Sequence, residues 1–152
     1  MNTPILGTDI VTQVGILVHD IEKARVEWAK LFRIEPPPVK LTGTHDEWQT
    51  EYMGKPSEAR AKLAFFRVGP QLELELIEPD KDPNSTWRAD LDKNGEGFHH
   101  IAFTVKGMGD VCKRLEDNGM KLLQKGEYPG GRYAYVDANE KLKLVLELLE
   151  ND

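Results

Sequence analysis

Two stretches of this chain repeat one pattern of leucine and glutamate. Residues 72–80 read LELELIEPD and residues 144–152 read LVLELLEND, so that Glu75 and Glu147 occupy matching positions 72 residues apart. Half of a chain this short buries too little surface to be stable alone, so an internal repeat predicts two similar modules that share one core. The repeat therefore limits the fold to a paired architecture within one domain.

A weaker match lies upstream of each copy. The sequence QVGILV from Gln13 corresponds in pattern to HIAFTV from His100, and both stretches are short and apolar, as expected of strands. Each half thus begins with a polar residue on an apolar strand and ends with a glutamate on another strand. Two halves that fold alike could bring four side chains to one point: Gln13, Glu75, His100 and Glu147.

Composition narrows the class of protein. The chain has 152 residues and a formal net charge of −6, which argues against nucleic acid as the main partner, because phosphate backbones favour clustered Lys and Arg. No apolar run is long enough for a membrane helix, and the N-terminus shows no secretory leader. The single cysteine, Cys112, excludes an intramolecular disulfide and is predicted to lie in the core. We expect a cytoplasmic protein without a membrane partner.

Hydrophobic periodicity predicts the same order of elements in both halves: a strand, a helix, and up to three further strands. The expected strands and helix of the first half are residues 11–18, 21–32, 62–68 and 71–77. Those of the second half are residues 98–105, 109–118, 121–125, 132–136 and 142–149. We expect a single domain over 1–152, with module 1 at about 10–79, a linker with a short helix at about 80–95, and module 2 at about 96–150.

The segment 39–60 does not follow the repeat. It is polar, contains Gly43, Gly54 and Pro56, and shows only a short strand pattern at 48–53. Long irregular segments in small domains are often functional, so we interpret this one as a candidate lid.

Strand alternation singles out Glu147. Its two neighbours on the same face are Val145 and Leu149, and the opposite face carries only leucines, so the strand is predicted to be buried on both sides. A buried carboxylate must be paired, protonated or bound to metal. A solvent-facing or lysine-paired glutamate is the alternative. Glu75 shares its face with Glu73, which by itself is more typical of a solvated face, and only the match to Glu147 favours a role in a site.

The paired histidines are distinguished by the same argument. Neighbouring residues on a strand face opposite sides, so His100 is predicted to lie on the open face and His99 to be a core histidine with a hydrogen-bond partner. His19 and His45 have no partner in the repeat and are interpreted as surface residues.

The four side chains form a plausible donor set. Two carboxylates, one amide oxygen and one imidazole suit Zn, Ni, Co, Mn or Fe(II), with positions left for water or substrate. The sequence has no GxGxxG, P-loop, GxSxG or CxxC, and its Gly130-Gly131 pair lies between two strands, which is typical of a turn.

This pattern resembles the vicinal oxygen chelate superfamily, which includes glyoxalase I, methylmalonyl-CoA epimerase, extradiol dioxygenases and bleomycin-resistance proteins. The resemblance covers nearly the whole chain and rests on four stretches: QVGILVHDIEKARVEWAKLF, LELELIEP, GFHHIAFTV and LVLELLE. It implies an α+β fold in which paired βαβββ modules form a curved mixed sheet around a central cleft.

The resemblance also implies a site and a chemistry. It assigns Gln13, Glu75, His100 and Glu147 as ligands of one divalent ion (Zn, Ni, Co or Mn), with Glu147 or Glu75 also moving a proton beside a carbonyl through a metal-bound enediolate. The implied function is that of a lyase or isomerase of the glyoxalase I or methylmalonyl-CoA epimerase type, acting on a thiohemiacetal or acyl thioester, and the implied assembly is a homodimer. Many relatives have histidine where this chain has Gln13.

The residues present also bear on the branch of the family and on alternatives to an enzyme. Dioxygenases need two histidines and a carboxylate on iron, so that branch is not expected. Residues 62–68 offer no carboxylate to act as a separate epimerase base. Two alternatives to the enzyme are a metal-free binding protein of the same fold, which would sequester an apolar or aromatic ligand, and a stress or regulatory protein whose site has decayed.

Overall fold

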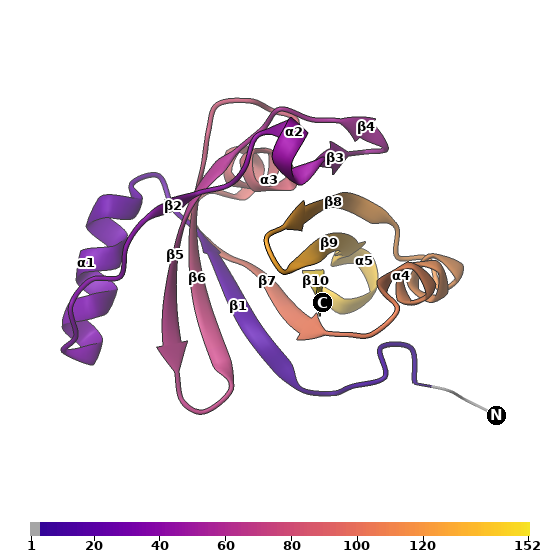
Figure 1. Cartoon of the computed structure of the whole chain (residues 1–152), viewed down its shortest axis with the longest axis horizontal. Helices are drawn as coiled ribbons and strands as arrows, with labels where there is room; N and C mark the ends of the chain where they lie inside the picture. Colours follow the sequence, from indigo (N-terminus) through magenta and orange to yellow (C-terminus); the bar gives the residue numbers. More distant parts are fainter. Residues whose placement is uncertain (1–3) are drawn as a thin grey trace.

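The computed structural model describes residues 4–152 and has an α+β fold built on one curved, mixed sheet (Figure 1). Residues 1–3, on which the expected absence of a leader partly rests, lie outside the described part. The sheet order is β2-β5-β6-β1-β7-β10-β9-β8-β3-β4. The strands are β1 (Val11–Leu17), β2 (Lys40–Leu41), β3 (Glu51–Tyr52), β4 (Lys55–Pro56), β5 (Ala61–Val68), β6 (Leu72–Pro79), β7 (Gly97–Thr104), β8 (Leu122–Tyr128), β9 (Gly131–Ala138) and β10 (Leu144–Asn151). The helices are α1 (Ile21–Phe32), α2 (His45–Trp48), α3 (Thr86–Asn94), α4 (Met108–Asp117) and α5 (Asn139–Leu142).

The two halves have matching topology, as the repeat predicts. In the first half β1 pairs in parallel with β6, and β6 pairs antiparallel with β5. In the second half β7 pairs in parallel with β10, and β10 pairs antiparallel with β9. The halves join where β1 runs antiparallel to β7. The strands β6, β1, β7 and β10 are therefore neighbours at the centre of the sheet.

Each long helix covers the outer face of its own half, and leucines of the repeat form the cores beneath. Leu74 and Leu76 pack with residues of α1, and Leu146 and Leu148 pack with residues of α4. Burial of these alternate side chains stabilises the fold by about 2 kcal/mol each. It also leaves the intervening glutamates on the concave face of the sheet, as alternation predicts.

A second pair of matched glutamates ties each helix to its strand. The Ile21 backbone N–H at the start of α1 donates to Glu78 Oε1 (3.0 Å), and the Gly107 and Met108 N–H groups at the start of α4 donate to the carboxylate of Glu150. Carboxylates at this end satisfy free backbone donors and interact favourably with the helix dipole. The matching glutamates at 78 and 150 therefore have a structural role.

The segment between β2 and β5 crosses from one edge of the sheet to the other. It leaves β2 beside β5, forms α2, and enters β3, which pairs with β8 of the second half (Figure 1). The short strand expected at 48–53 is present as Glu51–Tyr52. The segment thus links the two halves across the concave side, and its function as a lid stays a prediction.

Other boundaries differ modestly from the expected ones. β8 extends to Tyr128, and Leu142 ends the short helix α5 instead of beginning the last strand. The turn at Gly130 is confirmed, since this residue has φ +95° between β8 and β9. Within residues 4–152, no helix is long and apolar enough to cross a membrane.

Candidate metal centre

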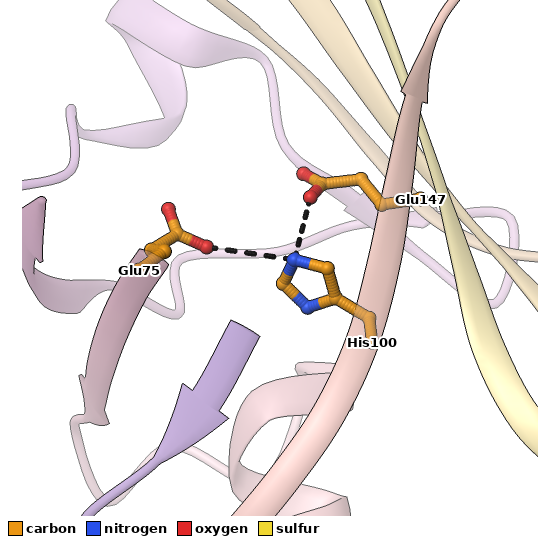
Figure 2. A group of neighbouring side chains, drawn as sticks. All are labelled: Glu75, His100 and Glu147. Carbon is orange, nitrogen blue, oxygen red and sulfur yellow. Dashed lines mark ion pairs between the residues drawn. The ribbon is translucent and has the colours of Figure 1, made fainter. Parts of the chain in front are cut away.

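The four side chains singled out by the repeat meet at the centre of the concave face. Nε2 of His100 lies 2.7 Å from Glu147 Oε2, 2.9 Å from Gln13 Oε1 and 3.7 Å from Glu75 Oε1. Figure 2 shows both carboxylates pointing toward the His100 ring from different strands. Because each side chain comes from one of the four central strands, a single chain supplies the whole cluster.

The His100 ring occupies space that a glycine leaves free. Gly15 lies opposite His100 across the β1–β7 pair, and a Cβ there would overlap the imidazole. Gly15 was not among the predicted site residues, although a glycine inside a strand pattern often indicates close approach of another group.

The prediction that His99 and His100 face opposite sides is wrong. On β1 the register passes in one step from Gly15 to Ile16, while on β7 it passes in two steps from His100 to Phe98. His99 is therefore the extra residue of a β-bulge, which disrupts alternation and allows both histidine rings to pack against Tyr135. His99 Nδ1 lies 2.9 Å from His100 Nδ1, and the two rings are nearly perpendicular. The expectation that His99 is buried and has a hydrogen-bond partner is nevertheless confirmed.

Burial changes the protonation of the cluster. All four side chains are buried, with His100 fully enclosed. Burial raises the pKa of Glu75 and of Glu147 well above the usual range, and the negative charge of Glu73 raises both further. Burial lowers the pKa of His100 to about 3, so the imidazole is neutral at physiological pH. The two carboxylates are thus costly to ionise unless a cation compensates their charge.

The geometry leaves polar atoms without partners. Nε2 offers one in-plane position for a hydrogen or a lone pair, yet three oxygens face it. Gln13 Oε1 lies within hydrogen-bonding distance of Nε2, whereas Glu75 Oε1 and Glu147 Oε2 have no hydrogen-bond partner despite their closeness to the ring. A hydrogen on Nε2 could serve only one of the three oxygens, and a lone pair there would leave room for a cation among all of them. Ligand atoms bound at about 2.1 Å to one ion and roughly 90–110° apart lie about 3.0–3.4 Å from one another, near the separations seen here. The residues therefore fit one divalent ion.

Two acidic side chains support the neutral members of the set from outside. Gln13 Nε2 donates to Glu73 Oε1 (2.8 Å), which turns the amide oxygen toward His100. On the other side, His99 Nε2 lies 2.9 Å from Asp90 Oδ2 on α3. Neither acid was among the predicted site residues: Asp90 carries no repeat signal, and Glu73 was interpreted as part of a solvated face.

Hydrogen bonds keep Asp90 charged. Burial opposes the charge, but hydrogen bonds from His99 and from the Thr86 hydroxyl (3.0 Å) lower the pKa of Asp90 below its usual value. Burial lowers the pKa of His99, which is therefore neutral like His100. A charged acceptor next to two neutral imidazoles defines where their hydrogens lie.

The cluster lies at the base of a cleft of about 620 Å³. Glu75 and Glu147 line it together with an aromatic wall of Trp48, Trp87, Tyr128, Tyr133 and Tyr135. Leu63 and Phe65 of β5 form part of the opposite wall. A cleft of this size with a few polar groups at its base suits a small organic molecule.

The remaining candidates lie apart from the cluster. His19 is exposed, as predicted, whereas His45 is half-buried with its Nδ1 3.1 Å from the Thr50 carbonyl. Cys112 is half-buried against the α4 core, and burial raises the pKa of its thiol. None of these residues lines the cleft.

The chain is similar in sequence to known proteins. A sequence model of the Glyoxalase/Bleomycin resistance protein/Dioxygenase superfamily matches residues 12–136. The uncharacterized protein YqjC of Bacillus subtilis (strain 168) is 31% identical over 140 residues, covering 90% of this chain and 89% of YqjC.

More distant relatives include enzymes. A 2-epi-5-epi-valiolone epimerase of Actinomyces sp is 26% identical over 142 residues (86% of this chain, 74% of the relative). Lactoylglutathione lyase of Escherichia coli O157:H7 is 29% identical over 96 residues (61% and 67%). Among solved structures, Streptomyces coelicolor methylmalonyl-CoA epimerase has the same fold, with a TM-score of 0.62 at 20% identity over 93% of this chain and 96% of that one.

Proposed function

The chain belongs to the glyoxalase/bleomycin resistance protein/dioxygenase superfamily, and from this premise we propose that it is a metal-dependent lyase or isomerase that moves a proton at the carbon beside a carbonyl group. The observation that carries the proposal is the buried cluster of Glu75, His100 and Glu147, whose donor atoms lie within 4.8 Å of one another. Gln13 completes it with an amide oxygen.

The donor set favours a metal over a purely structural cluster. Two buried carboxylates with unpaired oxygens destabilise a protein by several kcal/mol unless they are protonated or bind a cation. Three oxygens and one imidazole nitrogen suit Zn, Ni, Co or Mn. A single histidine ligand does not fit the two-histidine iron site of a dioxygenase.

A divalent ion bound here would act as a Lewis acid that stabilises negative charge on the carbonyl oxygen. The carboxylates supply the proton chemistry: one of them takes the proton from the adjacent carbon, and the C–H electron pair moves toward the carbonyl. Returning the proton to the same carbon from the other side gives an epimerase, and returning it to the neighbouring carbon gives a glyoxalase-type product. Burial raises the pKa of both carboxylates in the metal-free chain, and a bound cation would lower these pKa values again and favour the ionised form that a base requires.

The base is assigned to the ligand carboxylates by elimination among the described cleft residues. The acids that line the cleft are Glu73, Glu75 and Glu147, and Glu73 accepts a hydrogen bond from Gln13. No carboxylate of β5 reaches the cleft, which argues against a separate base in the first module. We propose Glu147 or Glu75 as the catalytic group, and a thiohemiacetal or acyl thioester as the substrate.

One observation also suits a second function, a metal-free protein that binds an aromatic or apolar ligand. The cleft has an extended aromatic wall, in which Trp48 and Trp87 each lie about 6 Å from Tyr133, centroid to centroid. This function leaves the two buried carboxylates without a purpose, so we place it second. A homodimer stays a prediction, and the proposed site does not require one, because all of its side chains come from one chain.

Metal content separates the two functions. Mass spectrometry of the purified, dialysed chain is expected to find about one divalent ion per chain, lost in Glu147→Gln. Turnover assays with thiohemiacetals and acyl-CoA epimers then identify the reaction. The enzyme proposal fails if no metal binds and if Zn, Ni, Co and Mn leave thermal stability unchanged. It fails also if Glu147→Gln keeps both the metal and full turnover.

A further inference from the structure

A chain of hydrogen bonds runs from the linker helix to the back of the His100 ring. Asp90 Oδ2 lies 2.9 Å from His99 Nε2, and His99 Nδ1 lies 2.9 Å from His100 Nδ1. Thr86 Oγ1 donates to the same oxygen of Asp90 (3.0 Å). Both rings are buried, so these contacts are shielded from water. Nothing in the proposed reaction requires His99 or Asp90 to touch a substrate.

The order of donors along this chain follows from the carboxylate. An ionised carboxylate only accepts hydrogen bonds, so His99 must carry its hydrogen on Nε2. Burial of His99 against a second imidazole favours the neutral ring, and a neutral imidazole with its hydrogen on Nε2 accepts at Nδ1. His100 must then donate from its own Nδ1, which leaves its Nε2 with a lone pair and no hydrogen. That lone pair faces Gln13, Glu75 and Glu147.

We propose that Asp90 and His99 are positioning residues that hold His100 in the Nδ1–H tautomer and thereby present the Nε2 lone pair to a divalent cation. The inference rests on the metal site of the proposed function and adds two residues to it. Ligand histidines commonly donate their other N–H to a fixed acceptor, which orients the ring and raises its basicity. Here that acceptor is a second imidazole, which the β-bulge on β7 turns inward.

The alternative hydrogen placement shows why Asp90 matters. Without a charged acceptor at Nε2, His99 is free to carry its hydrogen on Nδ1 and donate to His100. His100 Nδ1 then becomes the acceptor, and its hydrogen moves to Nε2, where it points at the three oxygens. A proton in that position excludes a cation. Substitution of Asp90, which acts on His100 through His99, is therefore expected to weaken metal binding without removing a ligand.

The first test measures Co²⁺ affinity of the metal-depleted chain by competition with a chromophoric chelator, together with the absorption spectrum of bound Co²⁺. We expect His99→Phe, which removes the acceptor for His100, to lose about 10–100-fold in affinity. Asp90→Asn is expected to shift affinity in the same direction by about tenfold. The matched control is Asp92→Asn, on the same helix and paired with Arg88 instead, which should bind Co²⁺ like the wild type.

A conservative variant separates hydrogen bonding from packing. His99→Gln places an amide oxygen near His100 Nδ1 and is expected to recover part of the affinity that His99→Phe loses. Equal losses in both variants would assign His99 a packing role and overturn the proposal. Wild-type Co²⁺ affinity in both Asp90→Asn and His99→Phe would also overturn the proposal. If His99→Phe does not fold, the Co²⁺ affinities of Asp90→Asn and Asp92→Asn still test the proposal, and equal affinities would overturn it.

A second measurement does not depend on metal. Nitrogen-15 NMR of the imidazoles in the metal-free wild type should show hydrogen on Nδ1 of His100 and on Nε2 of His99. Hydrogen on Nε2 of His100 would overturn the proposal even if the chain binds Co²⁺. The expected tautomers in a chain that binds no cation would support the positioning of His100 by Asp90 and His99 while overturning the proposed function.

Discussion

Gly15→Ala tests whether the space beside His100 is essential to the site. A Cβ at residue 15 would lie 2.7 Å from Nε2 of His100 and closer still to Nδ1 and Cε1. Comfortable contacts between such atoms begin at about 3.5 Å, so the ring must move by about 1 Å or more. Metal–ligand distances tolerate deviations of about 0.2 Å. The added methyl group is therefore expected to remove His100 as a ligand while leaving its chemistry intact.

Stability of the metal-free protein should fall as well. Overfilling a packed core costs about 1–3 kcal/mol. For a chain of this size each kcal/mol lowers the unfolding midpoint by about 2–4 °C. Calorimetry of the metal-free Gly15→Ala chain should therefore show a midpoint roughly 2–12 °C below the wild type. Once refolding of the Gly15→Ala chain has been verified, addition of Co²⁺ should no longer raise its unfolding midpoint.

The control is Gly109→Ala on α4, where a Cβ meets nothing within 4 Å and alanine favours the helix. It should keep or slightly raise the midpoint and bind Co²⁺ normally. A Gly15→Ala chain with wild-type stability and wild-type Co²⁺ affinity would refute the argument that His100 depends on the missing side chain.

Three further predictions concern glutamates. Glu73→Gln gives Gln13 a partner that can donate as well as accept, and chelator competition should detect weaker Co²⁺ binding because the amide is free to flip. The raised pKa values of Glu75 and Glu147 mean that the folded, metal-free chain binds more protons than the unfolded one above about pH 4.5. Its stability should therefore fall as pH rises through the folded-state pKa values. A pH series of thermal midpoints that is no steeper for the wild type than for Glu147→Gln would contradict this. Glu150→Gln removes the charge at the start of α4 and should slightly destabilise the fold without changing metal affinity, as measured by urea unfolding and Co²⁺ titration.

Strand alternation, together with the repeat, placed the acidic half of the site. Glu75 and Glu147 lie on the concave face because the leucines on either side pack beneath α1 and α4. This is a local pattern, and the repeat supplied the long-range part by matching the two strands. The convergence of Gln13 with His100 followed from the same match.

The errors and omissions have long-range or irregular causes. The bulge at His99 has no signal in the sequence, because His99 and His100 are identical residues and either register leaves one histidine inward. Asp90 reaches the site from the linker, outside the repeat, so no pattern links it to His99. Gly15 could have been identified, because a glycine within a strand has no propensity reason to be there.

The junction of β1 with β7 divides the candidate ligands evenly. Gln13 and Glu75 belong to the first half, and His100 and Glu147 belong to the second, so each half holds one neutral donor and one carboxylate. An ion held by all four is a cross-link between the halves, and neither half alone offers more than a weak two-point site. At a concentration 1,000 times its Kd it would add about 4 kcal/mol to stability, a large share of the roughly 5–15 kcal/mol typical of a folded domain. Separation of the halves and release of the ion would then be one event.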